Sequence, residues 1–125
     1  MEGEAMKAVS EASVLKACLQ LLQLRGVMAW RNNSTGIYDP AKKRFRSFHG
    51  LKGTADILGI VEQVIDLGGI ASHCGVFMAV ECKRPGEKPT PDQAAFLAAI
   101  EDRGGAAICV SDVRELDEWL TGLGV

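Results

Sequence analysis

Two acidic residues and a lysine lie at the ends of two apolar segments of this sequence. Asp56 precedes the stretch Ile-Leu-Gly-Ile, and Glu81-Cys82-Lys83 follows the apolar run from Gly75 to Val80. Because successive residues of a strand face opposite sides, Glu81 and Lys83 are expected to point one way and Cys82 the other. Ionised side chains beside so apolar a segment are costly unless they are paired or functional. Two carboxylates and an ammonium that meet at one point form a site for a divalent cation and an activated water, which is chemistry for phosphodiester hydrolysis.

Each of these groups suits a separate role. Asp56 and Glu81 are expected to hold Mg²⁺ or Mn²⁺, because hard cations prefer carboxylate oxygen, and the backbone carbonyl of Cys82 is a candidate further ligand. A lysine ammonium has an unperturbed pKa of about 10.4, and neighbouring carboxylates favour its charged form. We therefore expect Lys83 to act as a cation that orients the attacking water and stabilises the pentacovalent charge. The alternative is an ion pair with Glu81 at the end of a strand.

The length and composition indicate one globular domain. The chain of 125 residues is 47% hydrophobic and 6% aromatic, which is enough to bury a core without disulfides or structural metal. No apolar stretch reaches the length of a membrane span, and the N-terminus lacks the basic and apolar regions of a signal peptide, so we expect a cytoplasmic protein. The four cysteines form no C-x-x-C pair and are interpreted as structural thiols, with zinc binding or redox use as the alternative.

Positive charge is concentrated in one segment, although the net charge is −2. Seven basic residues and one acid lie between Arg25 and Lys52, whereas five basic residues and twelve acids follow from Gly53 onward. This asymmetry favours a polyanion-binding surface on an acidic body, with a solvated basic hairpin as the alternative. The candidate DNA-binding residues are Arg31, Lys43, Arg44, Arg46 and Lys52, which could contact phosphate.

The periodicity predicts an α/β fold with a mixed central sheet flanked by helices. Expected helices cover residues 10–25, 91–102 and 111 or 112–121, and expected strands cover 27–31, 55–64, 75–83 and 106–110. The apolar strand 75–83 has no alternation and is expected to be central. Residues 32–53 are expected to form a loop or irregular hairpin near the active edge, residues 66–75 a glycine-rich turn, and Trp30 a core side chain.

Several residues mark the ends of these helices. Ser10 is the expected N-cap of the first helix, and Gly26 suits its C-terminal stop. Thr90 is the expected N-cap of the second helix, with Pro91 at the first helical position. The second helix stops at Gly104-Gly105. Without the irregular segment, the predicted order is α-β-β-β-α-β-α in a single domain, 1–125, whose core covers about 9–120.

Asp56, Glu81-x-Lys83 and Gln93 in the following helix together resemble the PD-(D/E)XK nuclease superfamily. More narrowly, the chain resembles the virus-type replication-repair nuclease domain, VRR-NUC, over residues 9 to 120. The supporting stretches are Ser10-Glu11, Trp30 to Asn33, Lys52 to Gly59, Glu81 to Lys83, Pro91 to Gln93 and Ala107 to Val110. Ala55 is a departure, because the superfamily name has proline at that position.

The resemblance implies a restriction-endonuclease-like fold and a Mg²⁺- or Mn²⁺-dependent DNA endonuclease. It further implies a standalone phage or bacterial DNA-repair enzyme that forms a homodimer and cuts branched DNA such as Holliday junctions. Paired cuts at a four-way junction require two sites related by a twofold axis, for which the region around residues 65–77 is a candidate contact. The alternatives are a sequence- or flap-directed endonuclease of the same superfamily and a catalytically inactive DNA-binding module.

Two further catalytic candidates lie on the expected helices. By resemblance, Glu11 would supply a third carboxylate to the cation, directly or through water. The alternative is an exposed acid that stabilises the first turn through the helix dipole. Gln93, in the first turn of the second helix, could hydrogen-bond the attacking water or a base edge, with an exposed helix-start amide as the alternative.

Overall fold

The computed structural model describes residues 8–33, 38–45 and 51–125 and confirms an α/β fold with three helices and a four-stranded mixed sheet. The elements in chain order are α1 (Glu11–Leu24), β1 (Met28–Arg31), β2 (Tyr38–Asp39), β3 (Arg44–Phe45), β4 (Ile57–Asp66), β5 (Ala71–Cys82), α2 (Pro91–Asp102), β6 (Ala106–Val110) and α3 (Val113–Gly122). Among the described residues, no helix is long and apolar enough to cross a membrane.

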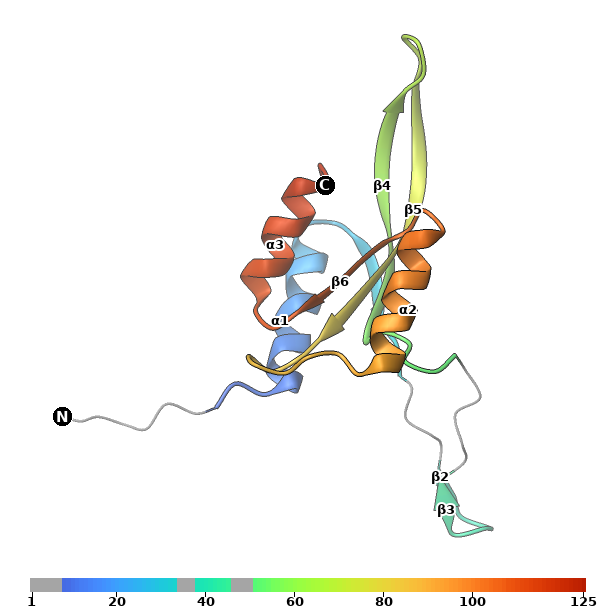
Figure 1. The fold of residues 1–125 in the computed structure, drawn as a ribbon, viewed down its shortest axis with the longest axis vertical. Helices are drawn as coiled ribbons and strands as arrows, with labels where there is room; N and C mark the ends of the chain where they lie inside the picture. Colours follow the sequence, from blue (N-terminus) through green and yellow to red (C-terminus); the bar gives the residue numbers. More distant parts are fainter. Residues whose placement is uncertain (1–7, 34–37, 46–50) are drawn as a thin grey trace, which may run out of the picture.

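The four main strands lie in the order β1-β4-β5-β6 (Figure 1). β1, β4 and β5 pair antiparallel, whereas β6 pairs parallel with β5 after the crossover through α2. β5 is an internal strand, as its unbroken apolar run predicted. The register places Ile57 opposite Val80. Asp56, immediately before β4, therefore lies beside the end of β5, where Glu81 is found.

Helices cover both faces of the sheet, with α1 and α3 on one face and α2 on the other (Figure 1). The larger core cluster joins α1 and α3 to the sheet. Its buried residues are Val14, Cys18, Leu22, Ile57, Val61, Met78, Val80, Cys82, Val110, Leu116 and Leu120. The smaller cluster consists of Ala55, Ala79, Leu97 and Ala107. Three of these four residues are alanines, which allow α2 to pack closely on the strands that carry the acidic groups.

The helix ends confirm the predicted caps. Ser10 and Thr90 each form a capping box, and Asp112 caps α3. Gly26 follows α1 with φ 71°, a left-handed conformation that glycine adopts without steric cost. Cys18 and Cys82 are fully buried, and all four cysteines are free thiols. The structural interpretation of the two buried thiols agrees with their place in the larger core.

Two predictions about the strands were wrong in detail. The predicted turn over 66–75 is shorter, because β4 continues to Asp66 and β5 already begins at Ala71. Residues 61–77 form a two-stranded ribbon beyond the ends of β1 and β6. Within the described residues, no helix covers the outer part of this ribbon, so the apolar alternation that would reveal a strand is weak. The predicted element order lacked β2 and β3, although the small hairpin that they form lies in the segment 32–53, where a loop or irregular hairpin was expected.

Trp30 was predicted to be a core residue, but 42% of its surface is exposed. It lies on β1, an edge strand, where it pairs with Leu58. Its neighbour Ala29 packs against the larger core instead. Because residues alternate along the strand, Trp30 faces the opposite side of the sheet, at an edge that α2 does not cover.

Candidate active site

Asp56 is fixed between β1 and the end of β5. Its backbone carbonyl accepts a hydrogen bond from the Asn32 N–H at 2.7 Å. Its carboxylate Oδ2 accepts from the Cys82 N–H at 2.9 Å. Ala55, the preceding residue, is fully buried in the cluster under α2. Backbone contacts on both sides therefore hold this carboxylate at the sheet edge, as the sequence predicted.

The loop before Asp56 touches the N-terminus of α2 at Gly53. Gly53 has φ +72°, and a Cβ at this position would lie 2.2 Å from the Asp92 carbonyl oxygen and 2.6 Å from the Gln93 nitrogen. Both the conformation and the space therefore require glycine. This contact sets the distance between the loop that carries Asp56 and the helix that carries Gln93.

Replacing Gly53 with alanine is expected to displace the Asp56 loop from α2. The left-handed conformation alone costs about 1–2 kcal/mol for a residue with a Cβ, and the clash adds to it. Gly68→Ala is the matched control, because Gly68 has φ +67° and open space around its Cβ position. We expect Gly68→Ala to lower only the unfolding free energy, measured by urea denaturation. Equal effects of the two variants on stability and on cation binding would contradict the positioning role of Gly53.

Glu81 is almost completely buried, with 2% of its surface exposed. Its Oε1 lies 3.4 Å from the Gln93 Nε2 that donates to it. Its Oε2 is buried and has no hydrogen-bond partner among the residues described. Burial first, and then the neighbouring carboxylate of Asp56, raise the pKa of Glu81 to about 9, and Lys83 only partly offsets them. Near pH 7 and without a cation, Glu81 is therefore largely protonated.

Lys83 is buried beside this acidic pair, with 8% of its surface exposed. Its N–H donates to the Val110 carbonyl at 2.9 Å, which prolongs the pairing of β5 with β6. Its Nζ lies 3.7 Å from Glu11 Oε1, which comes from the first turn of α1. Glu11 therefore contacts Lys83 in this structure. A direct contact between Glu11 and the cation stays a prediction.

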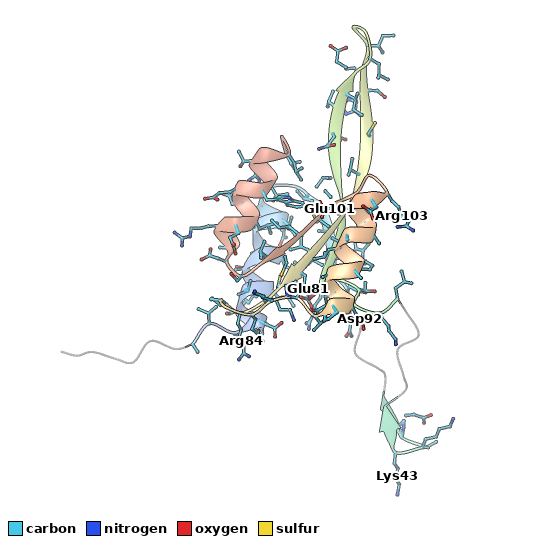
Figure 2. The ribbon with its side chains drawn as sticks, viewed as in Figure 1. Lys43, Glu81, Arg84, Asp92, Glu101 and Arg103 are labelled. Atoms are coloured by element: carbon cyan, nitrogen blue, oxygen red, sulfur yellow. The ribbon has the colours of Figure 1, made fainter. Side chains whose placement is uncertain are left out.

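Gln93 has two roles in the geometry of the site. Its Oε1 accepts from the Thr90 N–H at 2.9 Å, and its N–H donates to the Thr90 hydroxyl at 3.2 Å. The amide Nε2 of the same side chain is the group that faces Glu81. The capping box therefore fixes the rotamer of a side chain that contacts the acidic pair. Figure 2 shows Glu81 beside the start of α2, near Asp92.

The two carboxyl groups of Asp56 and Glu81 form a donor set that suits a divalent cation. Among the described residues, no three Asp, Glu, His or Cys side chains are grouped closely enough to enclose a metal ion. Mg²⁺ is commonly held by one or two carboxylates, with water and substrate phosphate completing its shell. Asp56 and Glu81 provide two such groups at neighbouring ends of the paired strands β4 and β5, and the Oε2 of Glu81, which has no partner among the described residues, is an oxygen that a cation would satisfy.

The predicted DNA-binding residues are spread over the surface. Arg31 lines a groove that also contains Asp56. Lys52 is exposed next to Gly53. Lys43 is exposed at the tip of the β2–β3 hairpin, and Figure 2 shows that this tip projects away from Glu81. Arg44 lies in β3, while Arg46 falls outside the described residues.

The structure also reveals polar residues that the sequence analysis missed. Lys16, Gln20 and Gln23 line the same groove as Arg31, along α1. Their spacing of four and three residues places them on one face of the helix. That spacing was a usable signal, but the apolar positions of the same helix drew the interpretation toward core packing.

No family model, curated protein or solved structure matches this chain.

Proposed function

We propose that this protein is a metal-dependent endonuclease of the PD-(D/E)XK type, similar to VRR-NUC domains, that hydrolyses phosphodiester bonds in DNA. The observation that supports the proposal most strongly is the position of Asp56 beside the end of β5, where Glu81 is buried, has one oxygen without a partner among the described residues, and is followed by the buried Lys83. An acidic pair of this kind is unfavourable in a folded protein unless a cation or a reaction uses it.

The residues of the site take complementary roles in this reaction. A Mg²⁺ or Mn²⁺ ion held by Asp56, Glu81 and the Cys82 carbonyl would polarise the scissile phosphate and promote ionisation of the attacking water. Lys83 places its positive charge where the pentacovalent phosphate gains negative charge. Glu11 holds the Lys83 ammonium, and Gln93 keeps Glu81 in position and can hydrogen-bond the attacking water.

Branched DNA, such as a Holliday junction, is the proposed substrate. Arg31, which lines the groove with Asp56, and the exposed Lys52 next to Gly53 offer contacts to phosphate near the acidic pair. Flap-directed or sequence-directed cleavage is the alternative for an active enzyme, and DNA binding without cleavage is the alternative for an inactive one. A DNA substrate implies a cytoplasmic setting, in a bacterium or in a phage-infected host.

The proposal is tested by cleavage of fluorescent four-way, flap and linear DNAs with Mg²⁺, Mn²⁺ or EDTA. We expect cleavage with either cation and none with EDTA. Asp56→Asn keeps an oxygen that can accept from the Cys82 N–H but removes a charge from the acidic pair, so its rate should fall at least about 100-fold. Asp102→Asn, an exposed aspartate at the end of α2, should cleave like the wild type. DNA binding without cation-dependent cleavage would instead favour the inactive module.

The proposed homodimer would form through the ribbon of β4 and β5. Apolar side chains are exposed on this ribbon and at its turn. They are Ile60, Val64, Ile65, Leu67, Ile70 and Phe77. A surface of this kind marks an interaction site in many proteins. Two copies joined there would place two cleavage sites about a twofold axis, as paired cuts at a four-way junction require.

Val64→Glu is expected to separate the dimer and to reduce cleavage of four-way junctions, because it buries a charge in the contact. The matched control is Leu24→Glu, which places the same charge at an exposed leucine on α1. Sedimentation velocity at micromolar concentration would measure the association state. A wild-type protein that is monomeric while it cleaves four-way junctions would contradict the dimer.

A further inference from the structure

A groove of about 600 Å³ leads away from the acidic pair between α1 and β1. Glu11 and Asp56 line it at the end where the acidic pair lies, and Gln23 lines it near the other end of α1. Gln23 lies twelve positions after Glu11, which corresponds to about 18 Å along a helix. We call this cavity the α1 groove. It is continuous with the proposed cleavage site, because Asp56 belongs to both.

The lining of the α1 groove combines three kinds of side chain. Leu15 and Leu19 provide apolar surface, and both are only partly buried by the larger core. Lys16 and Arg31 provide positive charge, and Gln20 supplies an amide alongside them. This combination suits a single strand of nucleic acid, because cations contact phosphate, apolar side chains pack against the faces of unpaired bases and amides reach base edges.

The polar groups of the groove are available for a ligand. The side chains of Lys16, Gln20, Gln23 and Arg31 make no hydrogen bond or ion pair with the part of the chain that the structure describes. Three of them are on α1, which is fixed by its buried face, so their positions are set before a ligand arrives. The cost of ordering them on binding is therefore confined to the side chains.

We infer that the α1 groove binds unpaired nucleotides of the DNA strand that enters the cleavage site. The inference rests on the proposed nuclease function and identifies the part of the protein that distinguishes branched from fully paired DNA. A cavity of this volume is in the range of small-molecule sites and accepts about one or two nucleotides, not a duplex. Lys16 and Arg31 offset the negative charge of Glu11 and Asp56 along the path of the strand.

Binding of a fluorescent oligothymidylate in EDTA, followed by anisotropy, tests the groove without cleavage. Lys16→Glu should weaken binding at least tenfold. Arg103→Glu is the matched control, because it makes the same charge change at an exposed residue following α2, and it should bind nearly as the wild type does. Gln20→Ala leaves the charge unchanged and should also weaken binding. The wild type and the two α1 variants should melt at nearly the same temperature, because both α1 side chains are exposed.

A cleavage comparison separates this inference from the proposed function. Wild-type protein should cut a flapped or branched DNA faster than a linear duplex, and Lys16→Glu should reduce that preference more than Arg103→Glu does. If the wild type binds the oligonucleotide and the α1 variants do not, but no DNA is cut, the nuclease proposal fails and the groove stands. If Lys16→Glu binds the oligonucleotide and cuts DNA like Arg103→Glu, the inference about the α1 groove is wrong and the nuclease proposal is unaffected.

Discussion

Replacing Glu81 with glutamine is expected to abolish cleavage and, at the same time, to stabilise the cation-free protein. The carboxyl group of Glu81 is buried against Asp56, and one of its oxygens has no partner among the described residues. A buried polar group without its hydrogen bond costs roughly 1–3 kcal/mol, and an ionised one costs more. Glutamine keeps the size of the side chain, leaves Asp56 with no acidic neighbour at this contact and supplies an amide donor to it.

The stability gained in Glu81→Gln should depend on pH. In the folded protein the pKa of Glu81 is raised to about 9, by burial first and by Asp56 second. The unfolded chain has an ordinary glutamate pKa, so between that value and about 9 the folded state holds a proton that the unfolded state lacks. The stability of the wild type therefore falls as the pH rises through this range. Glutamine does not titrate, so the variant lacks this loss of stability with rising pH.

Urea denaturation in EDTA at pH 6 and pH 8.5 measures this difference. The advantage of Glu81→Gln over the wild type should be larger at pH 8.5. Glu101→Gln, an exposed glutamate on α2, should leave both stability and its pH dependence unchanged. Equal stability of Glu81→Gln and the wild type at both pH values would show that the buried carboxyl group of Glu81 does not destabilise the folded protein. Full cleavage activity in this variant would remove Glu81 from the cation site.

The central part of the site was predictable because local patterns fix it. The unbroken apolar run before Glu81 identified an internal strand, and the Thr90-Pro91 sequence identified the start of α2. Pairing of β4 with β5 then places Asp56 next to Glu81 with little freedom. These relations depend on strand alternation, helix capping and sheet register, each of which involves residues close in sequence or directly paired.

Other features were not predictable, because they depend on which surfaces the helices leave uncovered. Trp30 has the composition of a core residue, but β1 is an edge strand whose α2-facing side stays partly exposed. Among the described elements, no helix covers the outer ribbon of β4 and β5, so the apolar alternation of its sequence is weak. The contact of Lys83 with Glu11 joins residues separated by most of the chain, and no local pattern specifies it.

Replacing Lys83 with methionine should slow cleavage by about 100- to 1,000-fold while DNA binding is largely retained. Methionine preserves the length and apolar stem of the lysine, and the buried position favours it. The ammonium also lowers the pKa of Glu81 against the effects of burial and Asp56. Its removal should therefore leave Glu81 more firmly protonated, so the variant should bind Mn²⁺ more weakly and need a higher pH to do so.

Two comparisons distinguish this electrostatic role from a structural one. Lys83→Arg keeps the charge but moves it, because a planar guanidinium replaces a compact ammonium. It should bind Mn²⁺ better than Lys83→Met while it remains a poor catalyst. Glu11→Gln removes the ion-pair partner and keeps the lysine, so its loss of rate should be smaller than that of Lys83→Met. Isothermal titration with Mn²⁺ and single-turnover cleavage would measure these effects separately. Lys83→Met could instead match the wild type in both Mn²⁺ binding and cleavage rate. The lysine would then have only a structural role at the end of β5, and the assignment of its charge to the reaction would be wrong.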